Sequence, residues 1–230
     1  MGSECVRAVL ADAELHLVGQ VDVGDDLAGL IKATSAQVVV DFTHPSVAYE
    51  NVLKIIGAGA RPVIGTTGFT VAQIDEIKKL SRQKKLGGLI APNFSIGAVL
   101  MMKFAAEAAK YLPQVEIIEK HHDNKADAPS GTAIQTAEKI VAAQKISGPK
   151  IKSKETISGS LGGDYQNIRI HSIRLPGFVA DQDVILGGLG QRLTISHETI
   201  DRAAFMPGVV LACKKVLGIS ELVYGLENLL

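Results

Sequence analysis

The chain has 230 residues, 47% hydrophobic and 21% charged, a balance that predicts a folded protein with a buried core. Its 24 basic and 24 acidic residues cancel, which argues against a nucleic-acid partner or an anionic membrane surface. Cys5 and Cys213 have neither the spacing of a disulfide framework nor that of a metal site, so we expect no metal. No apolar membrane span or secretion signal is visible, so we expect a cytoplasmic location.

The first part of the chain alternates apolar strands with helical patterns. A helix ends near Leu10. Strands are predicted over residues 15–22, 38–43, 61–68 and 86–93, and helices over residues 46–57 and 70–85. This alternation predicts an α/β fold with a parallel sheet.

Polar or glycine-rich residues follow each of these four predicted strands. The carboxyl ends of parallel strands meet at one edge of a sheet, where nucleotides bind. Each exit alone is a weak signal, because a Gly-Thr-Thr-Gly segment is also an ordinary strand-to-helix turn. Together they predict a nucleotide crevice formed by Asp22, by residues 41–45, by Gly65, Thr66, Thr67 and Gly68, and by Ala91, Pro92, Asn93 and Phe94.

The second part begins with a predicted helix over residues 97–111 and a strand over 115–119. A helix starts at Ala133, and residues 145–163 are expected to form a mobile loop. Three alternating strands joined by turns then predict a meander over residues 167–174, 178–186 and 191–197. His171 and His197 belong to this sheet and are interpreted as structural. Two helices, 201–217 and 220–230, are predicted to end the chain.

The loop from Glu119 to Ala133 combines proton-transfer groups, a cation and backbone donors. His121, His122 and Lys125 precede a Ser130-Gly131-Thr132 turn. Ser130 is placed as a helix N-cap, so the amides of Gly131 and Thr132 would face an anion at the start of the helix. A side chain at Gly131 would keep such a ligand from the backbone. By spacing alone, an ordinary helix cap and a polar strand end remain the competing interpretation.

This loop resembles the signature of the dihydrodipicolinate reductase family, E-x-H-H-x-x-K-x-D-x-P-S-G-T-A, and every fixed position is present. The family's D-F-T-x-P, G-T-T-G and A-P-N-F-S segments, which line its dinucleotide, stand at residues 41–45, 65–68 and 91–95. The resemblance covers the whole chain. It implies a doubly wound, Rossmann-like nucleotide domain, residues 1–94 plus 202–230, and an inserted α+β substrate and oligomerisation domain, residues 95–201, with a mixed or antiparallel sheet.

The same resemblance implies reduction of dihydrodipicolinate, or 4-hydroxy-tetrahydrodipicolinate, to tetrahydrodipicolinate with NADH or NADPH in lysine biosynthesis. A homotetramer is implied as well. Protonation of the reduced ring needs a positioned acid, which we assign to His121 and Lys125. The dicarboxylate is assigned to His122, Ser130, Gly131 and Thr132. Asp22 matches the ribose-binding acid, and the lack of an adjacent arginine favours NADH.

One departure concerns the start of the chain. The family opens with a strand and a glycine-rich phosphate loop, whereas Met1-Gly2 aligns with the last two residues of that motif, and Asp22 follows Gly2 at the fingerprint spacing. We therefore expect the first strand and most of the loop to be missing. Two alternatives stay open: a truncated, non-catalytic paralogue or fragment, and a different nicotinamide-dependent oxidoreductase with the same two-domain plan.

Overall fold

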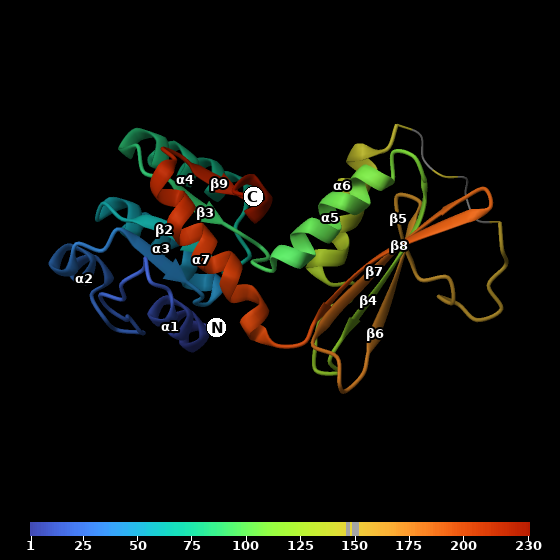
Figure 1. Cartoon of the computed structure of the whole chain (residues 1–230), viewed down its shortest axis with the longest axis horizontal. Coiled ribbons are helices and arrows are strands. Elements are labelled where there is room, and N and C mark those ends of the chain that lie inside the picture. Colours follow the sequence, from blue (N-terminus) through green and yellow to red (C-terminus); the bar gives the residue numbers. More distant parts are fainter. Residues whose placement is uncertain (146–147, 149–151) are drawn as a thin grey trace. The chain divides into compact units, whose positions relative to one another are not determined.

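The structure is a computed structural model that describes residues 1–145, 148 and 152–230. It divides into two compact units (Figure 1). The first unit comprises residues 1–96 and 202–230, and the second comprises residues 97–201. Among the described residues, every helix is too short or too polar to cross a membrane.

The first unit is built on a four-stranded sheet with helices packed around it. The strands are β1 (Val38–Asp41), β2 (Arg61–Ile64), β3 (Gly88–Ile90) and β9 (Leu222–Tyr224), in the order β1-β2-β3-β9. All three pairings are parallel, which confirms the predicted α/β sheet. Its helices are α1 (Gly2–Ala11), α2 (Leu27–Thr34), α3 (Pro45–Gly57), α4 (Val71–Lys84), η1 (Arg202–Phe205), α7 (Met206–Lys215), η2 (Val216–Gly218) and η3 (Leu226–Asn228).

Residues at the helix N-termini determine where the helices begin, and buried apolar side chains stabilise them. Pro45 opens α3 at a position where its missing N–H costs nothing, and Thr70 and Gln73 form a reciprocal capping box before α4. Ile55 and Ile56 of α3 and Ile77 of α4 are fully buried in one core with β2 and β3. Each such side chain stabilises the fold by about 1.5–3 kcal/mol.

The structure corrects the strand predicted over residues 15–22. Those residues are irregular, and β1 pairs only with β2, so β1 is an edge strand. A strand exists by pairing with a neighbour, and residues 15–22 have no such neighbour in the described part of the chain. Residues 15–21 instead border a cavity of about 520 Å³ together with α1, α2 and β1.

The predicted C-terminal helices are also corrected. The helix predicted over residues 201–217 is divided into η1, α7 and η2, because Pro207 is tolerated only in the first turn of a helix and α7 therefore begins at Met206. The helix predicted over residues 220–230 is wrong. Residues 222–224 form β9, paired with β3 from Gly88 to Ile90, and Gly225 turns the chain away with φ +90°.

The second unit has a five-stranded mixed sheet packed against two helices. Its order is β5-β6-β4-β7-β8. The elements are α5 (Ile96–Ala108), β4 (Gln114–His121), α6 (Gly131–Ala143), β5 (Gly163–Tyr165), β6 (Ile168–Arg174), β7 (Ala180–Gly188) and β8 (Gln191–Thr199). The predicted mobile loop, residues 145–163, lies partly outside the described residues.

The predicted meander is only partly right. β7 and β8 form a hairpin, but β4 lies between β6 and β7, parallel to the first and antiparallel to the second. β4 is therefore a central strand, with β6 paired to one edge and β7 to the other. The insertion carries the end of β4, and the loop that follows it, into the middle of the sheet.

Candidate active site

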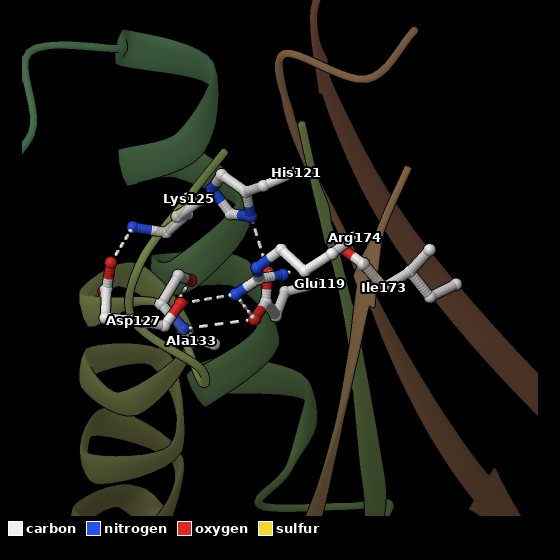
Figure 2. Close-up of polar contacts among 8 residues, drawn as sticks. Glu119, His121, Lys125, Asp127, Ala133, Ile173 and Arg174 are labelled. Atoms are coloured by element: carbon white, nitrogen blue, oxygen red, sulfur yellow. Dashed lines mark hydrogen bonds and ion pairs between the residues drawn. The ribbon is translucent and has the colours of Figure 1, made fainter. Parts of the chain in front are cut away.

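Glu119 and His121 come from the same face of β4. Side chains two residues apart in a strand point the same way, and this face is covered by α6. Nδ1 of His121 lies 2.5 Å from a carboxylate oxygen of Glu119, and the Glu119 side chain is fully buried (Figure 2). The predicted proton-transfer histidine is thus attached to a buried acid.

Arg174, at the end of β6, neutralises that acid. Its two Nη atoms donate to the two oxygens of Glu119 at 2.9 and 2.7 Å, and Nη2 also donates to the carbonyl of Asp127 at 2.7 Å (Figure 2). Burial opposes ionisation of Glu119, but hydrogen bonds from His121, Arg174 and Ser172 outweigh burial and lower the pKa of Glu119 to about 2. Glu119 is therefore a carboxylate throughout the neutral pH range.

Lys125 lies in the loop that follows β4. Its Nζ donates to the Asp127 carboxylate at 2.6 Å, and Asp127 is itself exposed (Figure 2). This hydrogen bond lowers the pKa of Asp127 despite the opposing effect of its partial burial. His122 is exposed directly after β4, and its carbonyl accepts the Lys125 amide at 3.2 Å. Loop geometry thus brings His122 and Lys125 to the end of β4.

Ser130 is the N-cap of α6, as predicted. Its hydroxyl accepts the Ala133 amide at 3.2 Å, and its own amide donates to Glu119 at 3.2 Å. Ser130 is buried, and its two hydrogen bonds, with Ala133 and Glu119, fix the start of the helix. Gly131 and Thr132 are the first residues of α6, at the positive end of the helix dipole. A Cβ at Gly131 would meet no protein atom within 4 Å, so its backbone is open to a ligand.

A second set of predicted residues lies at the carboxyl edge of the first unit's sheet. The buried Asp41 carboxylate accepts the Thr43 amide at 2.8 Å and the Thr66 hydroxyl at 3.2 Å. A Cβ at Gly65 would lie 2.0 Å from the Phe42 ring, so a side chain at this position would force the ring to move. The Phe42 and Phe94 rings pack with centroids 5.6 Å apart. Hydrogen bonds and ring packing therefore connect the segments that follow β1, β2 and β3.

The remaining predicted cofactor residues occupy varied environments. Thr67 is exposed, Ala91 is buried, Pro92 is half-buried, and the Asn93 side chain accepts the Ser95 amide at 2.8 Å. Asp22 lies in an exposed turn, where its carboxylate accepts the Val23 amide at 2.7 Å. In the described part of the chain, Asp22 forms hydrogen bonds with Val23 and Asp25 of the same turn.

Sequence reasoning gave no role to Arg174 or to Asp127. Arg174 is 55 residues away from Glu119 in the chain, and the available signal was only an arginine at the end of a predicted strand. His171, which was interpreted as structural, has its Nε2 atom 2.9 Å from a carboxylate oxygen of Glu116. No cluster of three or more His, Cys, Asp or Glu suited to a metal occurs in the part of the chain that the structure describes.

Comparison with known proteins decides the family. Residues 1–94 match the family described as dihydrodipicolinate reductase, N-terminus, and residues 97–230 match dihydrodipicolinate reductase, C-terminus. The chain belongs to the dihydrodipicolinate reductase family. Membership makes it an oxidoreductase of the α/β fold described above, and the family uses a nicotinamide cofactor.

Individual reductases of this family match almost end to end. The 4-hydroxy-tetrahydrodipicolinate reductase of Legionella pneumophila (strain Lens) is 53% identical over 94% of this chain and 89% of its own length. That of Streptococcus sanguinis (strain SK36) is 53% identical over 100% and 95%. The dipicolinate-bound dihydrodipicolinate reductase of Paenisporosarcina sp. TG-14 superposes with a TM-score of 0.91, at 43% identity, covering 100% of this chain and 95% of that one.

Proposed function

We propose that this reductase converts 4-hydroxy-tetrahydrodipicolinate, or the dihydrodipicolinate derived from it, to tetrahydrodipicolinate in lysine biosynthesis. The observation that carries the proposal is the group formed by His121 at the end of β4, Lys125 in the loop that follows, and the start of α6. The names of the matched relatives support the same substrate. We assign the first unit to the cofactor and the second unit to the substrate.

The dicarboxylate substrate is assigned to the start of α6. Amides of Gly131 and Thr132 and the dipole of a helix N-terminus favour a carboxylate, and Lys125 adds a positive charge. His122 is exposed and can contribute a further hydrogen bond. Ser130 contributes by capping the helix and so fixing these amides. The structural relative with bound dipicolinate, a planar dicarboxylate, supports this choice of ligand class.

The reaction consumes one proton, and two side chains take part in its transfer. Loss of water from 4-hydroxy-tetrahydrodipicolinate gives the conjugated dihydrodipicolinate ring. The nicotinamide cofactor, when bound, would supply hydride to a carbon of that ring. The added electron pair is then neutralised by one proton, which we assign to the ammonium of Lys125, with His121 as proton donor or acceptor in the same step. Solvent returns a proton to the group that gave one, so the enzyme is unchanged after each turnover.

We assign the dinucleotide to the carboxyl edge of the first unit's sheet. There a side chain at Gly65 would meet the Phe42 ring, and Thr67 is exposed. Thr66, Ala91, Pro92, Asn93 and Phe94 belong to the same edge and are assigned to the cofactor with them. Asp22 is assigned to the adenine ribose, and we propose that NADH is preferred over NADPH because no arginine adjoins it.

Replacing His121 or Lys125 tests the assignment. His121→Ala and Lys125→Ala should each lower kcat by about 10²-fold or more, the usual scale for general acid–base groups. His171→Ala is the matched control, because His171 also pairs with a glutamate of β4 but lies outside the loop. Turnover within a few-fold of the parent in both loop variants would refute the assigned roles. Absence of activity in the parent would favour a non-catalytic paralogue.

Assembly and location complete the proposal. We propose a cytoplasmic homotetramer in which the sheet of the second unit provides the interface. Support comes from β8, an edge strand whose side chains are mostly exposed. Sedimentation velocity of the purified chain measures the oligomer, and a concentration-independent monomer would contradict it.

A further inference from the structure

Glu119 is the most heavily hydrogen-bonded side chain of the loop region, and the roles assigned above leave it unused. It accepts hydrogen bonds from His121, from both Nη atoms of Arg174 and from the Ser130 amide. A buried carboxylate normally costs stability unless it is paired and hydrogen-bonded. Its partners here are the predicted proton-transfer histidine, an arginine and the N-cap of the substrate helix, which indicates a role in the reaction.

We propose that Glu119 is a positioning residue that keeps His121 protonated at Nδ1, so that Nε2 is the nitrogen that exchanges a proton, and that Arg174 keeps this arrangement neutral. This inference rests on the proposed function, because it explains how one of its two proton-transfer groups is oriented. It adds two positioning residues, Glu119 and Arg174, that do not themselves touch substrate.

The assignment of the ring nitrogens follows from the chemistry of an ionised carboxylate. A carboxylate has only acceptor oxygens, so the nitrogen that faces it must carry hydrogen. Nδ1 of His121 faces Glu119 at 2.5 Å and is therefore the donor in both the neutral and the charged ring. The proton that the ring gains or loses must then be the one at Nε2. A neutral ring presents a lone pair there, and a charged ring presents an N–H.

Arg174 has two consequences for the same pair. Its bidentate hydrogen bonds match the planar carboxylate and balance its charge, so the imidazole need not be charged to accompany Glu119 in the interior. Its further hydrogen bond to the Asp127 carbonyl holds the loop in which Lys125 sits. One guanidinium therefore contacts the supports of both proton-transfer groups.

Among the described residues, the charged group in contact with His121 is Glu119 on β4, which Arg174 on β6 contacts in turn. Lys125 and Asp127 lie in the loop that Arg174 also contacts. Lys120 pairs with Asp183, and as the intervening residue of β4 it points to the opposite face of the sheet together with its neighbours Asp181 and Glu198. Removing Glu119 or Arg174 should consequently change the electrostatics of His121 in opposite directions.

The test combines kinetics with a direct readout of the ring. Nitrogen-15 NMR of the full chain labelled at histidine, with His121→Gln to assign the signal, reports which nitrogen carries hydrogen in the neutral ring. We expect hydrogen on Nδ1 in the parent. In Glu119→Gln we expect a mixture of both forms, because an amide can donate or accept, and kcat lower by about tenfold or more, within the contribution of a general acid–base group.

The pH dependence of kcat separates positioning from general damage. Glu119→Gln removes an anion, so the histidine-dependent limb of the profile should move to lower pH. Arg174→Gln removes a cation, so the same limb should move to higher pH, and Arg174→Lys, which keeps the charge, should restore most of the parental position. Structural damage alone would not give opposite shifts.

Glu116→Gln is the matched control, since it breaks the other histidine–glutamate pair of this sheet, that of Glu116 with His171 at 2.9 Å, and should leave kcat and the His121 signal as in the parent. Hydrogen on Nε2 in the parent ring, or an unchanged ring and kcat in Glu119→Gln, would overturn the proposal. A parent without reductase activity would refute the proposed function, whereas the ring measurement would still decide the proposal about Glu119.

Discussion

The Nζ atom of Lys125 lies 2.6 Å from a carboxylate oxygen of Asp127, two residues further along the same loop. Lys125 thus already holds an anion of the chemical class that the substrate presents. The backbone of Asp127 has a different task, since its carbonyl accepts a hydrogen bond from Arg174. Side chain and backbone of Asp127 can therefore be separated by mutation.

Asp127→Asn should strengthen binding of dipicolinate (pyridine-2,6-dicarboxylate) by about two- to fivefold, which is the scale of an exposed ion pair. The reason is that a carboxylate of the ligand no longer competes with the Asp127 carboxylate for Lys125. The carbonyl contact with Arg174 is kept in this variant. Isothermal titration calorimetry measures the affinity, and Asp123→Asn, in the same loop, is the control for loss of one negative charge. Equal gains in both variants would show that only net charge matters.

Gly131→Val should weaken binding of the same dicarboxylate by about tenfold or more, because a side chain would then cover the amides at the start of α6, and tenfold is the effect of losing one good hydrogen bond to a charged group. Stability should change little, since no protein atom lies within 4 Å of the added Cβ. Gly57→Val is a suitable comparison, because Gly57 also lies in a helix with open space at its Cβ. Unchanged calorimetric affinity in Gly131→Val would remove the helix start from the substrate site.

Glu119 makes stability depend on acid. The folded protein holds its pKa at about 2, below the usual 4.5, so its contribution is fully present above pH 4.5 and is lost as the pH falls toward 2. The full shift corresponds to about 3 kcal/mol. Urea unfolding of the parent and of Glu119→Gln should therefore differ most near neutral pH and converge near pH 2. A difference that does not depend on pH would mean that Glu119 contributes through packing alone.

Local sequence patterns were sufficient for the elements whose identity is decided nearby. The apolar runs at β1, β2 and β3 are bounded by turns, and helix α4 has a capping box, so the type of each element could be predicted. Residues 15–22 have an equally strong strand pattern, but a pattern gives propensity and does not supply a pairing partner. β9 is the reverse case: its local pattern does not indicate a strand, and its three residues form one only because they pair with the distant strand β3.

The same limit applies to the site. His121, Lys125 and the start of α6 are close in the chain, so one loop motif revealed them together. Arg174 reaches Glu119 only because β6 pairs with β4 in a register that sets Glu119 opposite Ser172 and His121 opposite Arg174. Nothing near Arg174 in the sequence specifies that register, so its role required the folded sheet.

The cavity beside β1 leads to the last prediction. Val38, Val39 and Val40 of this edge strand line it, facing residues 15–21 and α1, and its volume is about 520 Å³. An apolar strand joined to the start of α1 by a G-x-x-G-x loop should pair with β1 and fill this space. The extended chain should unfold at higher urea concentration. It should also bind NADH about tenfold more tightly or better, since phosphate contacts from loop amides are charge-assisted hydrogen bonds. Titration of NADH fluorescence against both chains measures the affinity.

A control extension keeps the loop but replaces the apolar strand residues with serine and glycine. It separates the effect of the strand on stability from the effect of the loop on NADH binding, and it should recover less of the stability. Equal NADH affinity in the 230-residue and extended chains would contradict the prediction, because the added loop would then contribute nothing to cofactor binding.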